Sequence, residues 1–445
     1  MNPIVLEASQ MLGRHPILDE EDAYKIKYLN VLEYFVRTYA ASDIWANETL
    51  AFYVKKMLKD AGQYRYKNFN LQTDIRPVLI PRVHPFKIFT YSYCLIIDCI
   101  FICAFGDKEK GKEIYTELSS VYPIFYQEKL RRVFEAMYDS SVSTDGVGQI
   151  EYLKKCWDRN CEFFKEEPVK VIVTANMSAG KSTLLNAFVG KRVNKTQNDA
   201  CTAKIHKIVN KPYEDGFCYE WDYLLDLDAD YETLMDDNSD NPSPKITVGA
   251  FFRTIGQRPK RVWLIDTPGV NSSQNTDHKL LTEETIRNTE ADLLIYLMNG
   301  ENIGTDDDRK HLLFIQENYE GKILFVVNKV DRFRRGEDSI EETLKKVVFD
   351  LTNLGFENPE VVPVSSYAAY LAKMSIFSES LDEDDQDEYE RLSRKMKKAE
   401  YQLGRYYPEE VRENIDIGRK DQNRLLLLHS GLLHLEKMIY NYNMR

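Results

Sequence analysis

The stretch VKVIVTANMSAGKST, residues 169–183, indicates the fold of the larger part of this chain. Its first half, 169–175, is a short β-branched run of the kind expected of a buried parallel strand. Its second half, 175–183, has the pattern of a phosphate-binding loop that leads into a helix from about Lys181, with Ala175 in place of the first glycine. That glycine serves the turn out of the strand, where a methyl group fits if the backbone φ is negative. The stretch therefore predicts a strand, a nucleotide-binding loop and a helix.

The residues of this loop predict particular contacts with a nucleotide. Backbone N–H groups of such a loop, together with the helix N-terminus, cradle phosphate oxygens. Gly180 allows close approach of the backbone, Lys181 is expected to bridge the β- and γ-phosphates, and the Ser182 hydroxyl is expected to coordinate Mg²⁺. A chance Gly-Lys-Ser is the alternative when the loop is considered alone. The residues predicted to bind the nucleotide here are Asn176, Met177, Ser178, Ala179, Gly180, Lys181, Ser182 and Thr183.

A second motif, WLIDTPG at 263–269, ends a buried strand at an acidic residue. Asp266 is placed to hold the Mg²⁺ shell through a water molecule. Gly269 offers a backbone N–H near the γ-phosphate, so the loop that follows can respond to hydrolysis. The threonine that closes on Mg²⁺ and the γ-phosphate must lie between the first helix and this motif. Thr202 is the first candidate for that threonine, and Thr196 is the second.

Two further motifs predict recognition of guanine. NKVD, 328–331, follows another buried strand, and its aspartate can accept hydrogen bonds from N1–H and the exocyclic amine of guanine. Adenine lacks both donors, so the carboxylate would stay unpaired with ATP. The lysine of this motif is expected to lie along the base, and the asparagine is expected to tie loops together. SSYAA, 365–369, follows the next strand, where a loop should close over the base. The residues predicted on the base side are Asn328, Lys329, Asp331, Ser365 and Ser366.

The pattern of predicted strands and helices from 165 to 445 indicates an α/β P-loop GTPase domain with a doubly wound, mostly parallel sheet. Short apolar runs alternate with helical patterns, and each nucleotide motif follows its own predicted strand. A charged segment, 376–425, interrupts this rhythm and is expected to be a helical insertion with solvated charges. The predicted strands are 169–175, 261–266, 293–298, 323–328 and 361–366, and the predicted helices are 181–189, 277–290, 305–319 and 338–354.

The first part of the chain, 1–150, predicts a separate all-α domain. Apolar residues recur there at helical spacing, and a polar segment at 140–148 reads as a linker before a long helix at 149–165. The run 88–105 is the most apolar, but Asp98 interrupts it, which favours a buried core helix over a membrane span. The predicted helices are 21–41, 46–61, 88–105, 109–119 and 124–138.

Composition restricts the classes of partner and compartment. The 445 residues carry a formal net charge of −12, which argues against broad binding of nucleic acid or anionic lipid. The seven cysteines show no zinc or disulfide spacing, which suits a reducing cytosol. The N-terminus lacks a basic start and an apolar core, so no signal peptide is expected. We therefore expect a cytoplasmic protein, with peripheral membrane contact left open.

The motifs together resemble the dynamin superfamily, in particular the bacterial dynamin-like GTPases. This resemblance covers roughly 165–445, with 206–260 and the charged segment as interruptions. The residues that carry it are MSAGKSTLLNAFVG at 177–190, ACTAKI at 200–205, DTPGV at 266–270, NKVD at 328–331, VSSYAA at 364–369 and HSGLLHLEKMI at 429–439.

The resemblance implies a GTPase that binds Mg²⁺–GTP and hydrolyses it to GDP and phosphate, faster when two GTPase domains pair across their nucleotides. Ser178 matches the family's P-loop serine, which with the adjoining backbone helps to place a charge-compensating monovalent cation, such as K⁺, and the catalytic water. The implied catalytic residues are Ser178, Lys181 and Thr202, and the implied metal-site residues are Ser182, Thr202 and, through water, Asp266.

The chain departs from the family pattern in ways that affect function. Met177 stands where eukaryotic dynamins carry a glutamine, and no long helical stalk or lipid-inserting paddle follows the GTPase domain, so membrane remodelling is not carried over. Val270 stands where Ras-type GTPases carry the glutamine that orients water. The helices at 95–138 faintly resemble a tellurite-resistance-B-like module; an unrelated helical domain is the alternative.

Two alternatives to the dynamin-like enzyme stay open. Val270 cannot polarise water, so either another group positions the water or the domain is a slow GTP-dependent switch that recruits a protein partner through its N-terminal helices. Era-type ribosome-assembly GTPases share GKSTLLNA and DTPG with this chain. The acidic balance, the lack of a basic RNA-binding domain and Ser178 argue against that class.

Overall fold

A computed structural model divides the chain into two compact units. The first comprises Met1–Glu166 with Asp215–Tyr219 and Leu225–Asp228, and the second comprises Glu167–Glu214, Glu220–Leu224 and Ala229–Arg445. The residues that the structure describes are 8–68, 85–139, 141–145, 147, 150–176, 178–194, 204–234, 245–255, 260–269, 276–334, 336, 338–413 and 415–442.

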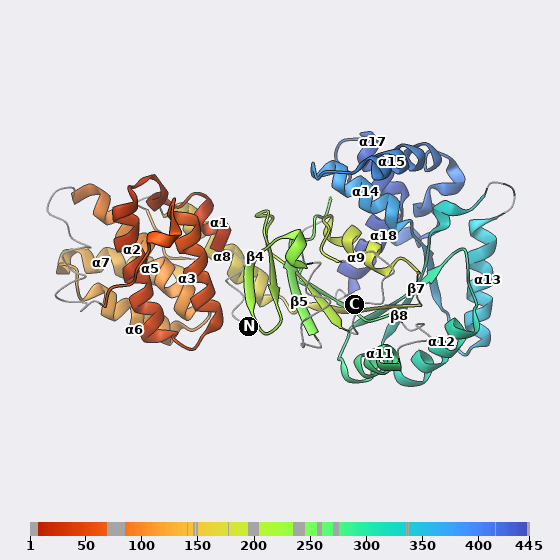
Figure 1. The fold of residues 1–445 in the computed structure, drawn as a ribbon, viewed down its shortest axis with the longest axis horizontal. Coiled ribbons are helices and arrows are strands. Elements are labelled where there is room, and N and C mark those ends of the chain that lie inside the picture. Colours follow the sequence, from red (N-terminus) through yellow and green to blue (C-terminus); the bar gives the residue numbers. More distant parts are fainter. Residues whose placement is uncertain are drawn as a thin grey trace. The chain divides into compact units, whose positions relative to one another are not determined.

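The first unit is built from helices, in agreement with the sequence (Figure 1). Polar side chains begin several of them. Asp43 accepts hydrogen bonds from the backbone N–H groups of the first turn of α3, and Asp107 does the same for α6, as N-cap residues do. Each predicted helix is present with its ends moved by no more than a few residues. The helices are α1 (Ala8–Gly13), α2 (Asp22–Tyr39), α3 (Ile44–Met57), α5 (Pro85–Ala104), α6 (Lys108–Ser119), α7 (Ile124–Tyr138) and α8 (Glu151–Lys165).

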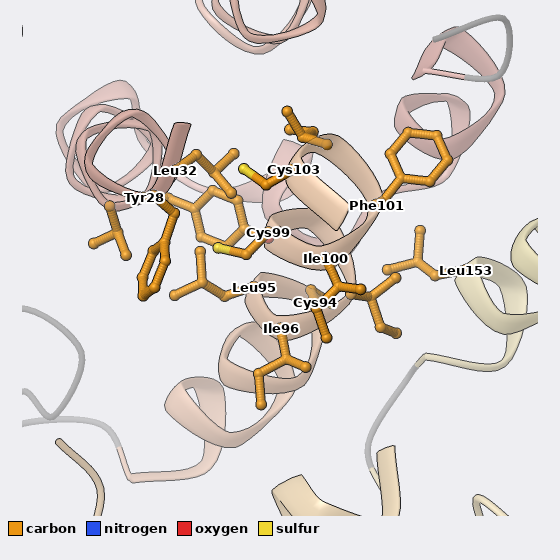
Figure 2. Close-up of a cluster of buried hydrophobic side chains, with 14 of the residues drawn as sticks. Tyr28, Leu32, Cys94, Leu95, Ile96, Cys99, Ile100, Phe101, Cys103 and Leu153 are labelled. Carbon is orange, nitrogen blue, oxygen red and sulfur yellow. The ribbon is translucent and has the colours of Figure 1, made fainter. Parts of the chain in front are cut away.

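Helix α5 supplies much of the core of this unit (Figure 2). Its side chains from Tyr91 to Ala104 are buried, and they pack with residues of α2 and α8 such as Leu32 and Leu153. Cys99 and Cys103 are small members of this core. The apolar run is therefore a buried core helix, and among the described residues no helix has the length and apolarity needed to cross a bilayer.

The polar interruption of this run, Asp98, lies at the centre of a buried hydrogen-bond cluster. Its Oδ2 accepts from the Tyr28 hydroxyl at 2.5 Å and lies 3.0 Å from His15 Nε2, and its Oδ1 accepts from the Tyr53 hydroxyl at 3.2 Å. All four side chains are at most 3 % exposed. A carboxylate that is wholly inside a protein needs such partners, because an unpaired buried charge is costly.

The chain forms a nine-stranded sheet with the order β4-β3-β5-β2-β6-β1-β7-β8-β9. Most of its strands belong to the second unit, whereas half of β3 and most of β4 lie in the segments Asp215–Tyr219 and Leu225–Asp228 of the first unit. Strands β6, β1, β7, β8 and β9 run parallel to one another. Strand β2 is antiparallel to β6 and parallel to β5. The predicted fold class is therefore confirmed. The strands are β1 (Val169–Ala175), β2 (Ile205–Asn210), β3 (Cys218–Trp221), β4 (Leu225–Ala229), β5 (Lys245–Ala250), β6 (Val262–Asp266), β7 (Leu293–Asn299), β8 (Lys322–Asn328) and β9 (Glu360–Pro363).

Helices cover both faces of this sheet. Figure 1 shows α11 and α12 on one side and α9, α14 and α18 on the other, as in a doubly wound fold. The strand predicted at 361–366 is too long: it ends at Pro363, because Ser365 leaves the sheet and caps α14 by accepting from Ala368 N. The helices are α9 (Lys181–Val189), α11 (Thr276–Asn288), α12 (Asp306–Asn318), α13 (Ile340–Asn353), α14 (Ser366–Ile376), α17 (Gln422–His429) and α18 (Leu432–Tyr440).

The charged segment 376–425 contains one longer helix, α15 (Glu383–Lys395), followed by short turns. Helical spacing predicts that Leu392, Met396, Ala399 and Leu403 share one helical face. The helix ends before Met396, and Ala399 is exposed while the other three are buried. The prediction that these four residues share one helical face is wrong, because the chain buries apolar residues at similar spacing after it has changed to 3₁₀ turns.

Candidate nucleotide-binding site

The phosphate-binding loop has the backbone that the sequence requires. Strand β1 ends at the fully buried Ala175, which is not among the residues with positive φ, so its methyl group fits in place of a glycine hydrogen. Gly180 has φ 88°, and a Cβ there would lie 2.5 Å from Asn328 Nδ2. Only glycine suits this position, because both the conformation and the space exclude a side chain.

Two non-glycine residues of the site have left-handed backbones. Ser178, in the phosphate loop, has φ 61°, and Lys329, in the guanine motif, has φ 63°. Such conformations cost free energy for residues with a Cβ and tend to occur at functional sites. The Ser178 side chain is exposed, whereas burial lowers the pKa of Lys329. Met177, which precedes Ser178, lies outside the described residues.

The phosphate side brings Lys181, Asp266 and an unpredicted asparagine together. Parallel strands β1 and β6 pair with Val173 opposite Asp266, which places this carboxylate beside the loop. Lys181 Nζ forms an ion pair with Asp266 Oδ1, and Asn194 Nδ2 donates to Asp266 Oδ2 at 2.8 Å. Asp266 is therefore held by both Lys181 and Asn194 beside the phosphate-binding loop.

Asn194 is itself held by a buried amide on α9. Asn186 Oδ1 accepts from the backbone N–H groups of Val193 and Asn194 at 2.9 Å each, and its Nδ2 donates to Asn194 O at 2.9 Å. Neither asparagine was predicted from the sequence. The available signal was Asn186 itself, a polar residue inside the apolar run LLNAFV.

The oxygen donors of the phosphate side suit Mg²⁺. Ser182 lies on the first turn of α9, and Asp266 ends the neighbouring strand, so a hydroxyl and a carboxylate flank the same loop. Hard oxygen ligands and an incomplete protein shell are what Mg²⁺ prefers when phosphates supply the remainder. Thr183 lies on the same first turn as Ser182. Thr202 and Thr196 lie outside the described residues.

The base side is organised by Asn328, the last residue of β8. Its Nδ2 donates to Ala179 O at 2.8 Å, and its Oδ1 accepts from Ser366 N at 3.0 Å, so one amide links the phosphate loop to the loop after β9. This is the tie between loops that the sequence predicts. Asp331 is 4 % exposed, and its Oδ1 accepts from the Ser365 hydroxyl at 2.7 Å.

Two buried polar atoms in these loops have no hydrogen-bond partner within the described part of the chain. They are Asn176 Oδ1, in the phosphate loop, and Ser366 Oγ, at the start of α14. The Asn176 amide nitrogen donates to Asp308 on α12, a contact that the sequence did not indicate. Buried polar atoms without partners are rare, and at a site they are available to a ligand or water.

The loop after β6 approaches the phosphate side. Thr267 N donates to Val173 O at 3.2 Å, and the Thr282 hydroxyl of α11 donates to Pro268 O at 3.0 Å. Gly269 follows and is partly exposed. Val270, which replaces the glutamine of Ras-type GTPases, lies outside the described residues.

All four loops follow the carboxyl ends of parallel strands β1, β6, β8 and β9, which meet at one edge of a doubly wound sheet. Ligands bind at this edge in open α/β sheets. Loops with these sequences in this arrangement define the P-loop GTPase class.

Comparisons with known proteins show what this chain is similar to. Residues 171–330 match the dynamin family. The chain is 26 % identical over 214 residues to a probable transmembrane GTPase, FZO-like, of Arabidopsis thaliana chloroplasts, covering 48 % of this chain and 21 % of that protein. It is 26 % identical to dynamin-like protein A of Bacillus subtilis over 43 % of this chain and 16 % of that protein. It is 24 % identical to dynamin-like protein 1 of Campylobacter jejuni over 69 % of this chain and 50 % of that protein.

The second unit is therefore similar to dynamin-family GTPases over residues 171–330, and the predicted resemblance is confirmed. The chain spans only 16 % to 50 % of the length of these three relatives. The resemblance of 95–138 to a tellurite-resistance-B-like module stays a prediction.

Proposed function

We propose that this chain is a dynamin-like GTPase that binds Mg²⁺–GTP in the second unit and hydrolyses it to GDP and phosphate. The observation that carries the proposal is the link made by Asn328. One side chain joins the phosphate loop to the loop after β9, which supplies the serine that contacts Asp331. The proposed phosphate and base subsites are therefore held at a fixed distance from each other. A bound Mg²⁺ would supply neutralisation of the charge on the β- and γ-phosphates.

The protein groups have separate roles in this proposal. Lys181 leaves Asp266 and contacts phosphate oxygens, Ser182 and Asp266 orient toward the metal shell, and Gly180 admits the phosphates against the backbone. Asp331 accepts from the guanine base. Catalysis is positional and electrostatic, with direct attack by water and no covalent intermediate.

Nucleotide competition tests the binding step. Unlabelled GTP, GDP and ATP are titrated against a fluorescent guanine nucleotide bound to the full chain, with Mg²⁺ and again with a chelator. We expect GTP and GDP to displace the probe at least 100-fold better than ATP, because a site built to hydrogen-bond a group rejects analogues that lack it by large factors. Equal displacement by ATP would refute guanine recognition.

Hydrolysis is proposed to be faster when two GTPase domains pair across their nucleotides. Ser178, exposed and in a left-handed conformation, is the proposed group that helps to place water and a monovalent cation such as K⁺. Turnover per monomer should then rise with protein concentration and fall when Na⁺ replaces K⁺. Thr202 is the proposed switch threonine.

A slow switch is the competing proposal, and Val270 supports it because valine cannot orient water. A flat, very slow rate at all protein and K⁺ concentrations would favour this alternative. A partner recruited through the N-terminal helices should then be recovered only with a non-hydrolysable GTP analogue. The expectation of a cytoplasmic protein leaves peripheral membrane contact open, and cosedimentation with liposomes in the same nucleotide states tests that contact. The net charge of −12 argues against a nucleic-acid partner.

A further inference from the structure

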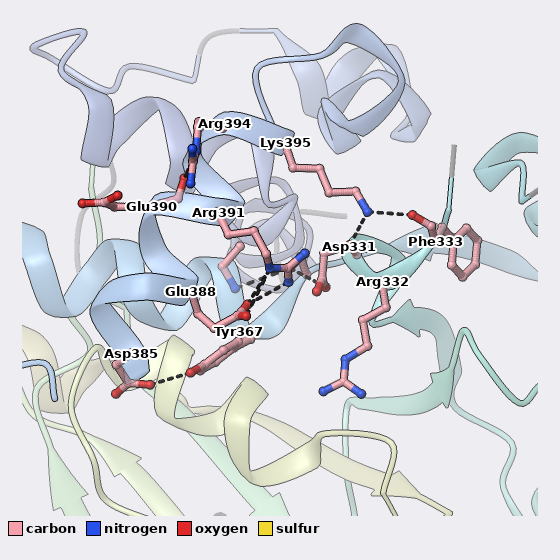
Figure 3. Close-up of polar contacts among 12 residues, drawn as sticks. Asp331, Arg332, Phe333, Tyr367, Asp385, Glu388, Glu390, Arg391, Arg394 and Lys395 are labelled. Atoms are coloured by element: carbon pink, nitrogen blue, oxygen red, sulfur yellow. Dashed lines mark hydrogen bonds and ion pairs between the residues drawn. The ribbon is translucent and has the colours of Figure 1, made fainter. Parts of the chain in front are cut away.

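The C-terminal residue of helix α15, Lys395, contacts the backbone of the NKVD motif and of the residues that follow it (Figure 3). Lys395 Nζ donates to Asp331 O and to Phe333 O, at 2.6 Å in both cases. The Tyr401 hydroxyl also donates to Phe333 O at 3.0 Å, and the Lys395 ammonium lies 4.5 Å from the centroid of the Tyr401 ring. The lysine is half-buried, so these contacts are not those of a freely solvated surface charge.

The two carbonyl groups belong to a segment with little regular structure of its own. Asp331 lies in a single 3₁₀ turn, Val330–Arg332, directly after the left-handed Lys329. A 3₁₀ turn this short offers few backbone hydrogen bonds. An ammonium group that draws two carbonyls of the turn together, with charge-assisted bonds, fixes the direction of the Asp331 Cα–Cβ bond.

Asp331 is thus held from two sides. Lys395 holds its backbone, and the Ser365 hydroxyl holds Oδ1 at 2.7 Å. Within the residues that the structure describes, no protein donor forms a hydrogen bond with Oδ2. The carboxylate therefore keeps capacity to accept hydrogen bonds while its position is fixed.

The remainder of α15 is anchored so that its cationic end stays in place. At its first turn, Asp385 accepts from the Tyr367 hydroxyl at 2.5 Å and from Arg192 Nη2 at 2.7 Å. Four residues before Lys395, Arg391 is paired with Glu388, and Figure 3 shows its guanidinium directed toward Asp331. The hydrogen bond to Glu388 raises the pKa of Arg391, and the charge of Asp331 adds to that rise.

We propose that α15 is a specificity element of the nucleotide site and that Lys395 is a positioning residue, which orients Asp331 to accept both guanine donors. The inference rests on the proposed binding of guanine nucleotides to this unit. It assigns a function to a charge run that composition alone would place in solvent. The contacts reach the carbonyl of the residue that reads the base, which a generic surface ion pair would not do.

The test compares GTP with ITP, which lacks the exocyclic amine and can donate only one of the two hydrogen bonds. Lys395→Met keeps the length of the side chain and removes its donors. We expect the affinity of the full chain for GTP to fall about tenfold, the value of one charge-assisted hydrogen bond, and the affinity for ITP about threefold or less. In hydrolysis, KM for GTP should rise while kcat changes little.

Two variants keep the test independent of folding. Lys397→Met, at an exposed position just beyond the helix, is the matched control and should leave both affinities unchanged. Lys395→Arg retains a cation with N–H donors and should restore part of the GTP preference. If Lys395→Met left the ratio of the GTP and ITP affinities unchanged, the inference would be overturned. If the unmodified chain itself shows no preference for GTP over ATP, the proposed function fails instead.

Discussion

Each unit of this chain contains a buried carboxylate, and the two differ in how many of their oxygens are hydrogen-bonded to protein groups. Asp98 in the first unit accepts from two tyrosine hydroxyls and faces a histidine nitrogen, so both of its oxygens are occupied by protein groups. Asp331 in the second unit accepts one hydrogen bond from a serine hydroxyl through a carboxylate oxygen, and its backbone carbonyl accepts another from Lys395. A saturated carboxylate stabilises a core, whereas a fixed and partly unsaturated one can recognise a ligand.

The largest effect is expected at Asp98. Asp98→Ala leaves the donors of Tyr28, Tyr53 and His15 without their acceptor inside the core, and each buried donor left unsatisfied costs about 1–3 kcal/mol. Amide hydrogen exchange of α2 and α5, measured by mass spectrometry, should rise by orders of magnitude. Binding of GTP by the second unit should persist.

The exposed Asp145→Ala serves as the control, with exchange as in the unmodified chain. If Asp98→Ala exchanged no faster than this control, the buried cluster would not be a determinant of stability. The proposed contrast between a stabilising Asp98 and a ligand-binding Asp331 would then fail for Asp98.

A smaller loss, in binding and not in folding, is expected for Asp331→Asn. The amide presents one acceptor and one donor where guanine requires two acceptors, so affinity for GTP should fall about 100-fold. Xanthine carries a carbonyl in place of the exocyclic amine, so XTP should bind the variant better than it binds the unmodified chain. Competition titrations measure both, and a variant that still preferred GTP over XTP would refute the assigned role.

The two carboxylates also show what a sequence reveals. Each nucleotide motif directly follows its own strand, so the loops could be located from short apolar runs and from glycine, lysine and aspartate at fixed spacing. The role of Asp98 was harder to see, since His15 and Tyr28 lie 83 and 70 residues away.

The contacts of Lys395 could not have been predicted. Its partners are backbone carbonyls 64 and 62 residues distant, which have no side-chain signature. Its helix also ends where helical spacing continues, since Met396 at the C-cap and Leu403 in a later 3₁₀ turn both stay buried. Asn194 was missed for a similar reason, because its partner Asp266 is 72 residues away.

Acid should weaken the second unit through a histidine that, unlike His15, has no carboxylate partner among the described residues. His311 Nε2 lies 2.9 Å from the Thr174 hydroxyl, and burial, with a smaller contribution from the charge of Lys279, lowers the pKa of His311 to about 4. A depressed histidine pKa favours the folded state above about pH 6.5, and this contribution is lost as the pH falls toward 4. The loss at pH 5 should be about 2 kcal/mol.

His311→Gln, which can keep the hydrogen bond to Thr174 but does not titrate, should flatten the fall in stability between pH 6.5 and 4. Urea denaturation followed by exchange in β1 and α12 measures this slope. An unchanged slope would assign the acid sensitivity to another group, with His434 as the next candidate because burial lowers its pKa to about 4 as well.

The smallest effect, and the sharpest test of the comparison, is expected for Ser365→Ala. This change removes the only side-chain donor among the described residues that holds Asp331 Oδ1, and a hydrogen bond to a charged acceptor contributes about 1.5–3 kcal/mol at most. Part of that value is recovered, because the Lys395 contact still fixes the backbone and water or the base can solvate the freed oxygen. We therefore expect GTP affinity to fall about fivefold, and the loss of the α14 N-cap should lower stability by about 1 kcal/mol. Combined with Lys395→Met, the loss should exceed the product of the single losses, because each contact orients the same carboxylate. Strict additivity in competition titrations would mean that serine and lysine act on separate features of the site, and Asp331 would then be no better fixed than any exposed carboxylate.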